Sequence, residues 1–175
     1  YIAPQKIGAI NNPVNYNLSP GETAQIISHN KPKVYIYDSE VKDMAVKALQ
    51  MSEHKPQVVI MAITNNKEVQ CPEGHILYTD YVRNQSDSDP ILESASIYDE
   101  VTRLQTSGTT GLPKGVPLNN VNEVLSAHDV LMHFPLNSTD KTMNMTPWFH
   151  RGGLHSGGLT PTFYAGGEVI IMRIF

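Results

Sequence analysis

The sequence predicts a layered α/β fold with mixed, partly parallel sheets, and three observations lead to this class. Strand-like runs of β-branched and aromatic residues alternate with stretches that carry apolar residues at helical spacing, and this order favours parallel strands. Residues 57–63 form a run rich in Val, Ile and Met, as in a strand buried on both faces. The 175-residue chain is 40% hydrophobic and 17% charged, which suits a folded core.

Caps and periodicity indicate the elements of the first half. Apolar residues at helical spacing predict a helix over residues 2–10, which an Asn-Asn-Pro sequence ends. Ser19 and Glu22 flank Pro20 as a capping box, so a second helix is expected from there to about residue 30. We further expect a strand over 33–38, an amphipathic helix over 41–54, the buried strand over 57–63, a polar loop over 64–74 and a helix or irregular segment over 75–83.

The second half begins with a polar, acidic stretch over residues 84–93, the best linker candidate. Strands are then expected over 101–105, 116–118, 143–146 and 168–172, with helices over 120–133 and 155–164. The sequence therefore predicts an αβ unit over residues 1–83, a linker over 84–97 and a second unit over 98–175.

Charge and cysteine content argue against several classes of protein. The formal net charge is −4, so we expect no basic face for nucleic acid. Cys71 is the only cysteine, which excludes an internal disulfide and indicates a reducing, cytoplasmic compartment. Apolar runs such as residues 58–63 are too short for a transmembrane segment. The chain starts without Met or a signal-peptide pattern, and we expect it to begin inside a larger protein.

Residues 106–115, with the sequence TSGTTGLPKG, combine backbone freedom with hydroxyl groups and one cation. Glycines let backbone amides approach a ligand closely, and Lys114 adds a compact, mobile ammonium. Amides, hydroxyls and an ammonium suit the oxygens of a triphosphate or pyrophosphate. On composition alone, a Gly/Thr turn between two strands is the alternative. The predicted phosphate contacts are Thr106, Ser107, Gly108, Thr109, Thr110, Gly111 and Lys114.

This stretch differs from the usual P-loop, which has Gly directly before the Lys and a hydroxyl directly after it. Here Pro113 precedes Lys114 and Gly115 follows it, so an ordinary P-loop nucleoside triphosphatase is disfavoured. The segment after Lys114 looks extended. We therefore expect the phosphates in a hairpin-like loop between strands, with little help from a helix dipole.

The string TSGTTGLPKGV resembles the phosphate-loop signature of the adenylate-forming superfamily, which includes acyl-CoA and aryl-CoA synthetases, peptide-synthetase adenylation domains and firefly-type luciferases. The resemblance extends to residues 9–20 and to Pro147-Trp148-Phe149-His150 with the glycines after it. It implies an incomplete portion of the large N-terminal domain, a layered αβ sandwich. Peptide-synthetase domains typically have Phe-Asp near this point, so His150 favours the acyl-CoA or aryl-CoA synthetase branch.

That resemblance implies a two-step, ATP-dependent reaction. A carboxylic acid attacks the α-phosphate to give an acyl-adenylate and pyrophosphate, and the thiol of CoA then displaces AMP. Lys114 would stabilise the developing charge on pyrophosphate as a catalytic residue. Mg²⁺, expected from the family, would share this task, with Thr106 as the hydroxyl nearest the metal.

In the family, the residues that match Trp148, Phe149 and His150 line the passage between the acyl pocket and the nucleotide. By that analogy His150 would be catalytic at the carboxylate or α-phosphate, and Phe149 or Trp148 would wall the acyl site. Room for a tail would come from Gly152, Gly153, Gly157 and Gly158. Alternatively, Trp148 and Phe149 are ordinary core and His150 is a satisfied, partly buried histidine. The five-residue spacing of the histidines at 150 and 155 matches no zinc motif.

Other motifs of the family, for adenine, ribose and the C-terminal lid, are not found in these 175 residues. We therefore expect a segment that is inactive by itself. The identity of the acid stays open among fatty, aromatic and short-chain acids, with a role in fatty acid metabolism among the expectations. A non-catalytic phosphate-binding or interaction module, a peptide-synthetase adenylation domain and a luciferase-like enzyme are the alternatives.

Overall fold

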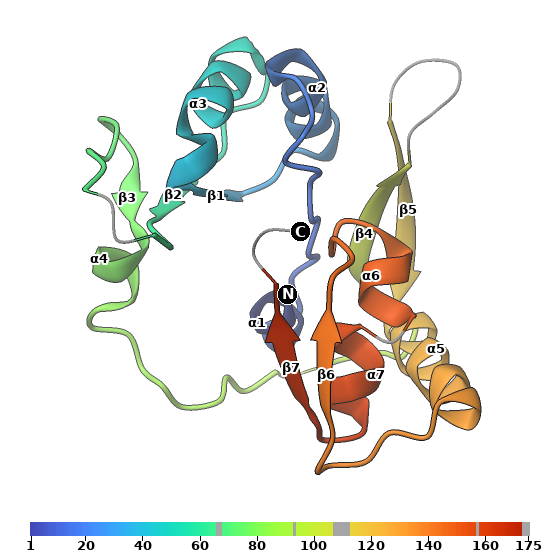
Figure 1. Cartoon of the computed structure of the whole chain (residues 1–175). Coiled ribbons are helices and arrows are strands. Elements are labelled where there is room, and N and C mark those ends of the chain that lie inside the picture. Colours follow the sequence, from blue (N-terminus) through green and yellow to red (C-terminus); the bar gives the residue numbers. More distant parts are fainter. Residues whose placement is uncertain (66–67, 93, 107–112, 157, 173–175) are drawn as a thin grey trace. The chain divides into compact units, whose positions relative to one another are not determined.

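The computed structural model describes residues 1–65, 68–92, 94–106, 113–156 and 158–172, and it has the predicted mixed α/β character (Figure 1). The chain divides into two compact units, Tyr1–Val14 with Asp89–Phe175, and Asn15–Ser88. The sequence-based division placed residues 1–83 in one unit and began the next at 98. In the structure the first fourteen residues group instead with the C-terminal half.

The unit Asn15–Ser88 is a parallel sheet with two helices packed on one face. Strands β1 (Val34–Asp38), β2 (Val58–Ala62) and β3 (Ile76–Leu77) follow the order β1-β2-β3. Its helices are α2 (Pro20–Asn30), the 3-10 turn η1 (Ser39–Val41), α3 (Lys42–Met51) and α4 (Tyr78–Val82).

Small and branched side chains form the core of this unit. Ala24 and Ile27 of α2 meet Ala48 and Leu49 of α3, with Tyr35 and Val59 packed beneath them. Because side chains alternate along a strand, Val34 and Ile36 point to the opposite face of the sheet, where they are exposed.

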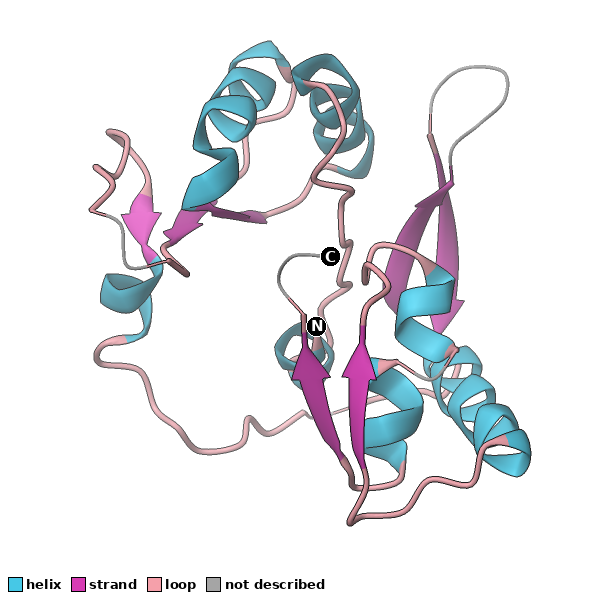
Figure 2. Ribbon diagram, in the orientation of Figure 1, coloured by secondary structure: helices cyan, strands magenta, loops and turns pink. Residues whose placement is uncertain are grey.

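The unit formed by Tyr1–Val14 and Asp89–Phe175 contains two two-stranded sheets (Figure 2). Strands β4 (Glu100–Thr106) and β5 (Lys114–Asn119) pair antiparallel, and β6 (Lys141–Asn144) pairs parallel with β7 (Glu168–Ile171). Its helices are α1 (Ile2–Lys6), α5 (Asn120–His133), α6 (Arg151–His155) and α7 (Leu159–Tyr164). The buried leucines Leu104, Leu118, Leu154 and Leu159 join the β4–β5 hairpin to α6 and α7.

The helix predicted over residues 2–10 is too long. It ends at Lys6, and Gly8 adopts a φ of +67°, a left-handed conformation that interrupts a helix. The chain then runs beside β4, where the N–H of Asn11 donates to Val101 O at 2.9 Å and the N–H of Arg103 donates to Asn11 O at 2.8 Å. These two backbone bonds, together with the packing of Tyr1 against the leucine cluster, attach residues 1–14 to this unit.

The helix predicted over residues 155–164 starts later than expected, and a separate short helix precedes it. α6 starts earlier and ends at His155, and α7 starts at Leu159. Gly158 lies between them in an extended conformation that no helix contains, with φ −94° and ψ −144°. Among the described residues, none of the helices has the length and apolar character that crossing a membrane requires.

The capping box at the start of α2 is present as predicted. The N–H of Ser19 donates to Glu22 Oε2 at 2.9 Å, and the N–H of Glu22 donates to Ser19 Oγ at 3.3 Å. We expect Ser19→Ala to lower the free energy of unfolding by about 1 kcal/mol, because the first turn loses its side-chain acceptor. Urea unfolding measures this, with Gln25→Ala on the exposed face of α2 as control. Equal stabilities for the two variants would contradict the prediction.

Candidate functional site

The strands that flank the predicted phosphate loop form a hairpin, as the sequence indicated. Thr106 at the end of β4 lies opposite Lys114 at the start of β5, and Thr106 Oγ1 donates to Lys114 O at 3.3 Å. Both residues are exposed. The predicted contacts at Ser107, Gly108, Thr109, Thr110 and Gly111 lie outside the described residues.

The base of this hairpin is held firmly by side chains. Arg103 makes two bonds of 2.6 Å to the carboxylate of Glu100, and its stem lies over Gly115, where an added Cβ would be 2.8 Å from Arg103 Cδ. Gln105 Nε2 donates to Asn12 Oδ1 at 3.3 Å. These contacts fix the two strands, and so they fix the backbone positions of Thr106 and Lys114 at the strand ends.

The donor groups at the hairpin end fit an anionic oxygen ligand. Lys114 takes part in none of the ion pairs formed between described residues, so its ammonium is available for an external anion. An exposed ammonium suits phosphate oxygens, and the Thr106 hydroxyl could donate to them only in place of its 3.3 Å bond to Lys114 O. Groups of three or more His, Cys, Asp or Glu side chains that could hold a metal are absent from the part of the chain that the structure describes.

His150 lies at the N-terminus of α6, where its extended backbone caps the helix. Its N–H donates to Pro147 O at 3.2 Å, and its carbonyl accepts from the N–H groups of Gly153 and Leu154. The backbone is therefore fixed while the imidazole is exposed. The Phe149 ring lies against it, with ring centroids 4.6 Å apart and planes tilted by 53°.

Trp148 is half-buried and packs against the leucine cluster that joins the hairpin to α6 and α7. Its indole N–H donates to Asn144 Oδ1 at 3.2 Å, and Asn144 Nδ2 donates to Gly153 O at 2.9 Å. These contacts are those of a core residue. Of the two aromatic residues, Phe149 is the one whose ring contacts the imidazole of His150.

The glycines after His150 have different surroundings. Gly152 is exposed, and an added Cβ would meet nothing within 4 Å. Gly153 is buried, and its Cβ would be 2.2 Å from Pro147 O. Gly158 crosses so closely that its Cβ would be 1.8 Å from Gly153 O. Close contact between backbone segments therefore requires glycine at positions 153 and 158, whereas Gly152 faces open space. Gly157 lies outside the described residues.

A buried acid–base couple that the sequence analysis did not identify lies beneath this region. Glu123 of α5 and His155 of α6 are 6% and 3% exposed, and Glu123 Oε2 is 2.9 Å from His155 Nε2. Tyr1 Oη donates to the same carboxylate oxygen at 2.9 Å and is 3.0 Å from Thr102 Oγ1 of β4. The indication that the sequence offered was the position of Glu123, which lies on the inward-facing side of the helix predicted over residues 120–133.

Electrostatics favour the ionised carboxylate in this couple. Burial raises the pKa of Glu123, but the hydrogen bond and charge of His155, with the hydroxyls of Tyr1 and Thr102, outweigh it and bring the pKa below its ordinary value. Burial also raises the pKa of the Tyr1 phenol, which therefore remains a donor.

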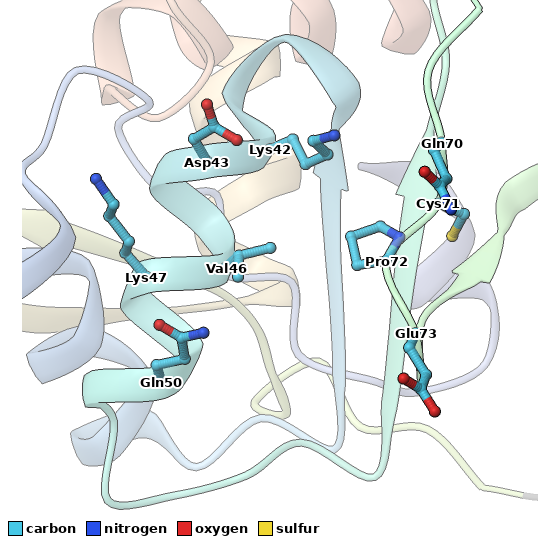
Figure 3. Close-up of a pocket in the computed structure, with 9 residues that line it drawn as sticks. All are labelled: Lys42, Asp43, Val46, Lys47, Gln50, Gln70, Cys71, Pro72 and Glu73. Atoms are coloured by element: carbon cyan, nitrogen blue, oxygen red, sulfur yellow. The ribbon is translucent and has the colours of Figure 1, made fainter.

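The unit Asn15–Ser88 has an open hollow of about 490 Å³ between α3 and residues 70–73 (Figure 3). Val46 and Pro72 face each other across it. Acidic and basic side chains are mixed along its wall, so it has no charge preference that would select a ligand. Burial raises the pKa of the Cys71 thiol, which disfavours the reactive thiolate. The lining residues are Lys42, Asp43, Val46, Lys47, Gln50, Gln70, Cys71, Pro72 and Glu73.

Comparison with known proteins assigns the class. A family model described as AMP-binding enzyme matches residues 1–175, and the chain belongs to this adenylate-forming family. It is 32% identical over 162 residues to 4-coumarate--CoA ligase 1 of Arabidopsis thaliana, covering 89% of this chain and 28% of the relative. It is also 28% identical over 152 residues to a long-chain-fatty-acid--CoA ligase of Thermus thermophilus, covering 86% of this chain and 26% of the relative.

Solved structures agree in fold. The anthranilate CoA ligase AuaEII, in complex with anthranoyl-AMP, superposes with a TM-score of 0.81 at 25% identity, covering 94% of this chain and 31% of that one. ATP-bound MatB of Rhodopseudomonas palustris superposes with a TM-score of 0.76 at 23% identity, over 100% of this chain and 32% of that one, a likeness of fold. The chain thus spans about a quarter to a third of the length of these proteins.

The two adjacent glycines of α6 provide a matched test of the backbone packing. We expect Gly153→Ala to lower the free energy of unfolding by about 3 kcal/mol, because the new methyl must displace the backbone of residues 146–147. Gly152→Ala should leave stability unchanged or raise it by up to about 1 kcal/mol, since alanine favours a helix. Chemical denaturation of both variants measures the difference, and similar stabilities would contradict it.

The Glu123 carboxylate should make stability depend on pH in the acid range. Its folded pKa lies below the unfolded one, so its contribution is complete above the unfolded pKa of about 4.3 and is lost as pH falls through the folded value. The stability difference between wild type and Glu123→Gln should therefore shrink on acidification below that range. Urea unfolding of both proteins at a series of pH values measures it. A pH-independent difference would exclude this contribution.

Proposed function

We propose that the full-length protein is an ATP-dependent acid–thiol ligase that activates a carboxylic acid as an acyl-adenylate and then forms its CoA thioester. The observation that carries the proposal is the family match over the whole chain together with the exposed Thr106 and Lys114 at one hairpin end. The CoA ligases among its relatives support the thiol acceptor.

The first step requires stabilisation of a leaving group. A carboxylate oxygen of the acid bonds to the α-phosphorus, and the bond between that phosphorus and the bridging oxygen breaks as pyrophosphate departs. We assign Lys114 and Thr106, with residues 107–111 of the loop, to the oxygens of pyrophosphate. Lys114 is suited to this role because its charge is not committed to an internal partner among the described residues.

We assign His150 to the carboxylate or the α-phosphate. Its exposed imidazole on a fixed backbone can donate a hydrogen bond to an oxygen that gains charge during the attack. Phe149, against His150, is our candidate for the wall of the acyl site, and Trp148 supports that wall from the core. Gly152, which faces open space, leaves room beside His150, whereas Gly153 is needed by the backbone.

Magnesium, when bound, would supply positive charge to the phosphate oxygens. In this chain the exposed hydroxyl of Thr106 is the candidate that fits it, because hard cations prefer oxygen ligands. We propose the class of substrate as a small-molecule carboxylic acid, with fatty, aromatic and short-chain acids to be distinguished by assay. The free, half-buried Cys71 fits the cytoplasmic setting that we propose.

The test measures AMP and pyrophosphate formation by the full-length protein with ATP, Mg²⁺, CoA and a panel of carboxylic acids. We expect release of AMP that depends on both the acid and CoA, and pyrophosphate exchange into ATP that depends on the acid alone. Hydrolysis of ATP to ADP, with no AMP, would reject the proposal. The 175-residue chain alone is expected to be inactive, because it spans about a quarter to a third of its relatives.

Replacement of the hairpin lysine tests the assignment of the leaving group. In the full-length protein, Lys114→Met should reduce kcat for acyl-adenylate formation by about 10²- to 10³-fold, since the transition state loses a positive charge. Lys141→Met removes a similarly exposed charge, in an ion pair with Glu168, and should leave kcat unchanged. Equal kcat values for Lys114→Met and wild type would remove Lys114 from the mechanism.

A further inference from the structure

The buried couple of Glu123 and His155 connects the two halves of the candidate site. His155 is the last residue of α6, whose N-terminus His150 caps. Glu123 belongs to α5, and Tyr1 links the same carboxylate to Thr102 of β4, the strand that ends at Thr106. One hydrogen-bonded network therefore reaches both the helix with His150 and the hairpin with Lys114.

Stability alone does not account for this network. A buried carboxylate bonded to a histidine must overcome the desolvation of both groups, and replacing a buried pair of this kind by apolar residues of similar volume is often neutral or stabilising. Glu123 Oε1 is buried and has no hydrogen-bond partner among the described residues, which adds to the unfavourable side. What such a pair does supply is direction, because a hydrogen bond has a preferred distance and angle and so restricts the relative orientation of the two helices that carry its donor and acceptor.

α6 needs an external anchor of this kind. It has five residues, too few to be stable in isolation, so its orientation comes from its contacts. At its C-terminal end His155 bonds to Glu123, and at its N-terminal end Arg151 Nη2 donates to Ser126 Oγ of α5 at 2.8 Å. His150 is five residues from His155, roughly 7.5 Å along the helix axis, so a tilt at the buried end moves the imidazole.

We propose that the Glu123–His155 couple is a positioning device, which holds α6, and thereby His150, in register with the β4–β5 hairpin for acyl-adenylate formation. The proposal rests on the proposed function for its catalytic part. Neither residue contacts substrate in this scheme, since both are buried beneath the site. Their effect on the reaction passes through the placement of His150.

The experiment uses the full-length protein and three variants. Glu123→Leu with His155→Leu replaces the couple by apolar side chains, whereas Glu123→Gln keeps an acceptor for His155 and Tyr1. Lys141→Gln with Glu168→Gln removes an exposed ion pair of the same unit, with a 2.7 Å separation, and serves as the matched control. The measurements are Tm, kcat and KM for ATP and the acid, and amide hydrogen exchange of residues 150–156.

For the double leucine variant we expect an unchanged or higher Tm, faster exchange in residues 150–156, and a kcat lowered by about 10- to 100-fold, because misplacement by an ångström costs that much. KM for ATP should stay within about twofold, since Tyr1 and Thr102 of β4 can keep their mutual hydrogen bond. Glu123→Gln should have a kcat within about threefold of the wild-type value, because its side-chain oxygen can still accept hydrogen bonds from Tyr1 and His155. The matched control should resemble wild type in all readouts.

An unchanged rate of amide hydrogen exchange in residues 150–156 of the double leucine variant would overturn the proposal. A wild-type kcat in that variant would also overturn it, and so would a loss of kcat that matches a lower folded fraction. If that variant does not fold, His155→Gln takes its place with the same readouts. If the wild-type protein forms no acyl-adenylate with any acid, the proposed function fails instead. The exchange of residues 150–156 then still decides whether the couple holds α6.

Discussion

The packing of four leucines underlies the whole site. Leu104 and Leu118 come from the two strands of the hairpin, and Leu154 and Leu159 come from α6 and α7. Burial of such side chains supplies about 1.5–3 kcal/mol each. The hairpin has Lys114 at its end and α6 follows His150, so this apolar contact joins the two elements that carry residues separated by 36 positions in the printed sequence. The polar contacts around the leucine cluster adjust the orientation of elements that the leucines already hold together.

Polar groups then refine the arrangement. Asn144 accepts from Trp148 and donates to Gly153 O, and so ties the turn before α6 to the end of β6. Glu123 and His155 do the same for the other end of the helix. Because buried hydrogen bonds hold this short helix, the backbone of His150 is restrained while its imidazole stays exposed. The energetic cost of burying such polar groups is consistent with a requirement for precise geometry.

Much of the fold could be predicted from the sequence because its signals are local. The capping box of Ser19 and Glu22, the apolar run over β2 and the extended segments of β4 and β5 each specify structure within a few residues. Long-range contacts carried no such signal. The sequence did not indicate the pairing of Asn11 with β4 beyond the shortened first helix, or the crossing of Gly158 over Gly153 before the last one. The couple of Glu123 and His155 was missed for the same reason, since its members are 32 residues apart.

The contrast between the two neighbouring glycines of α6 also makes this region accessible to spectroscopy. A Cβ added at Gly152 would meet nothing within 4 Å, and the residue lies two positions from His150, so a cysteine there could carry a fluorophore or a spin label. The chain's native thiol, Cys71, is half-buried and has a raised pKa, which slows its alkylation relative to an exposed thiol. Selective labelling at position 152 would place a reporter beside the imidazole while leaving the tightly packed backbone of Gly153 undisturbed.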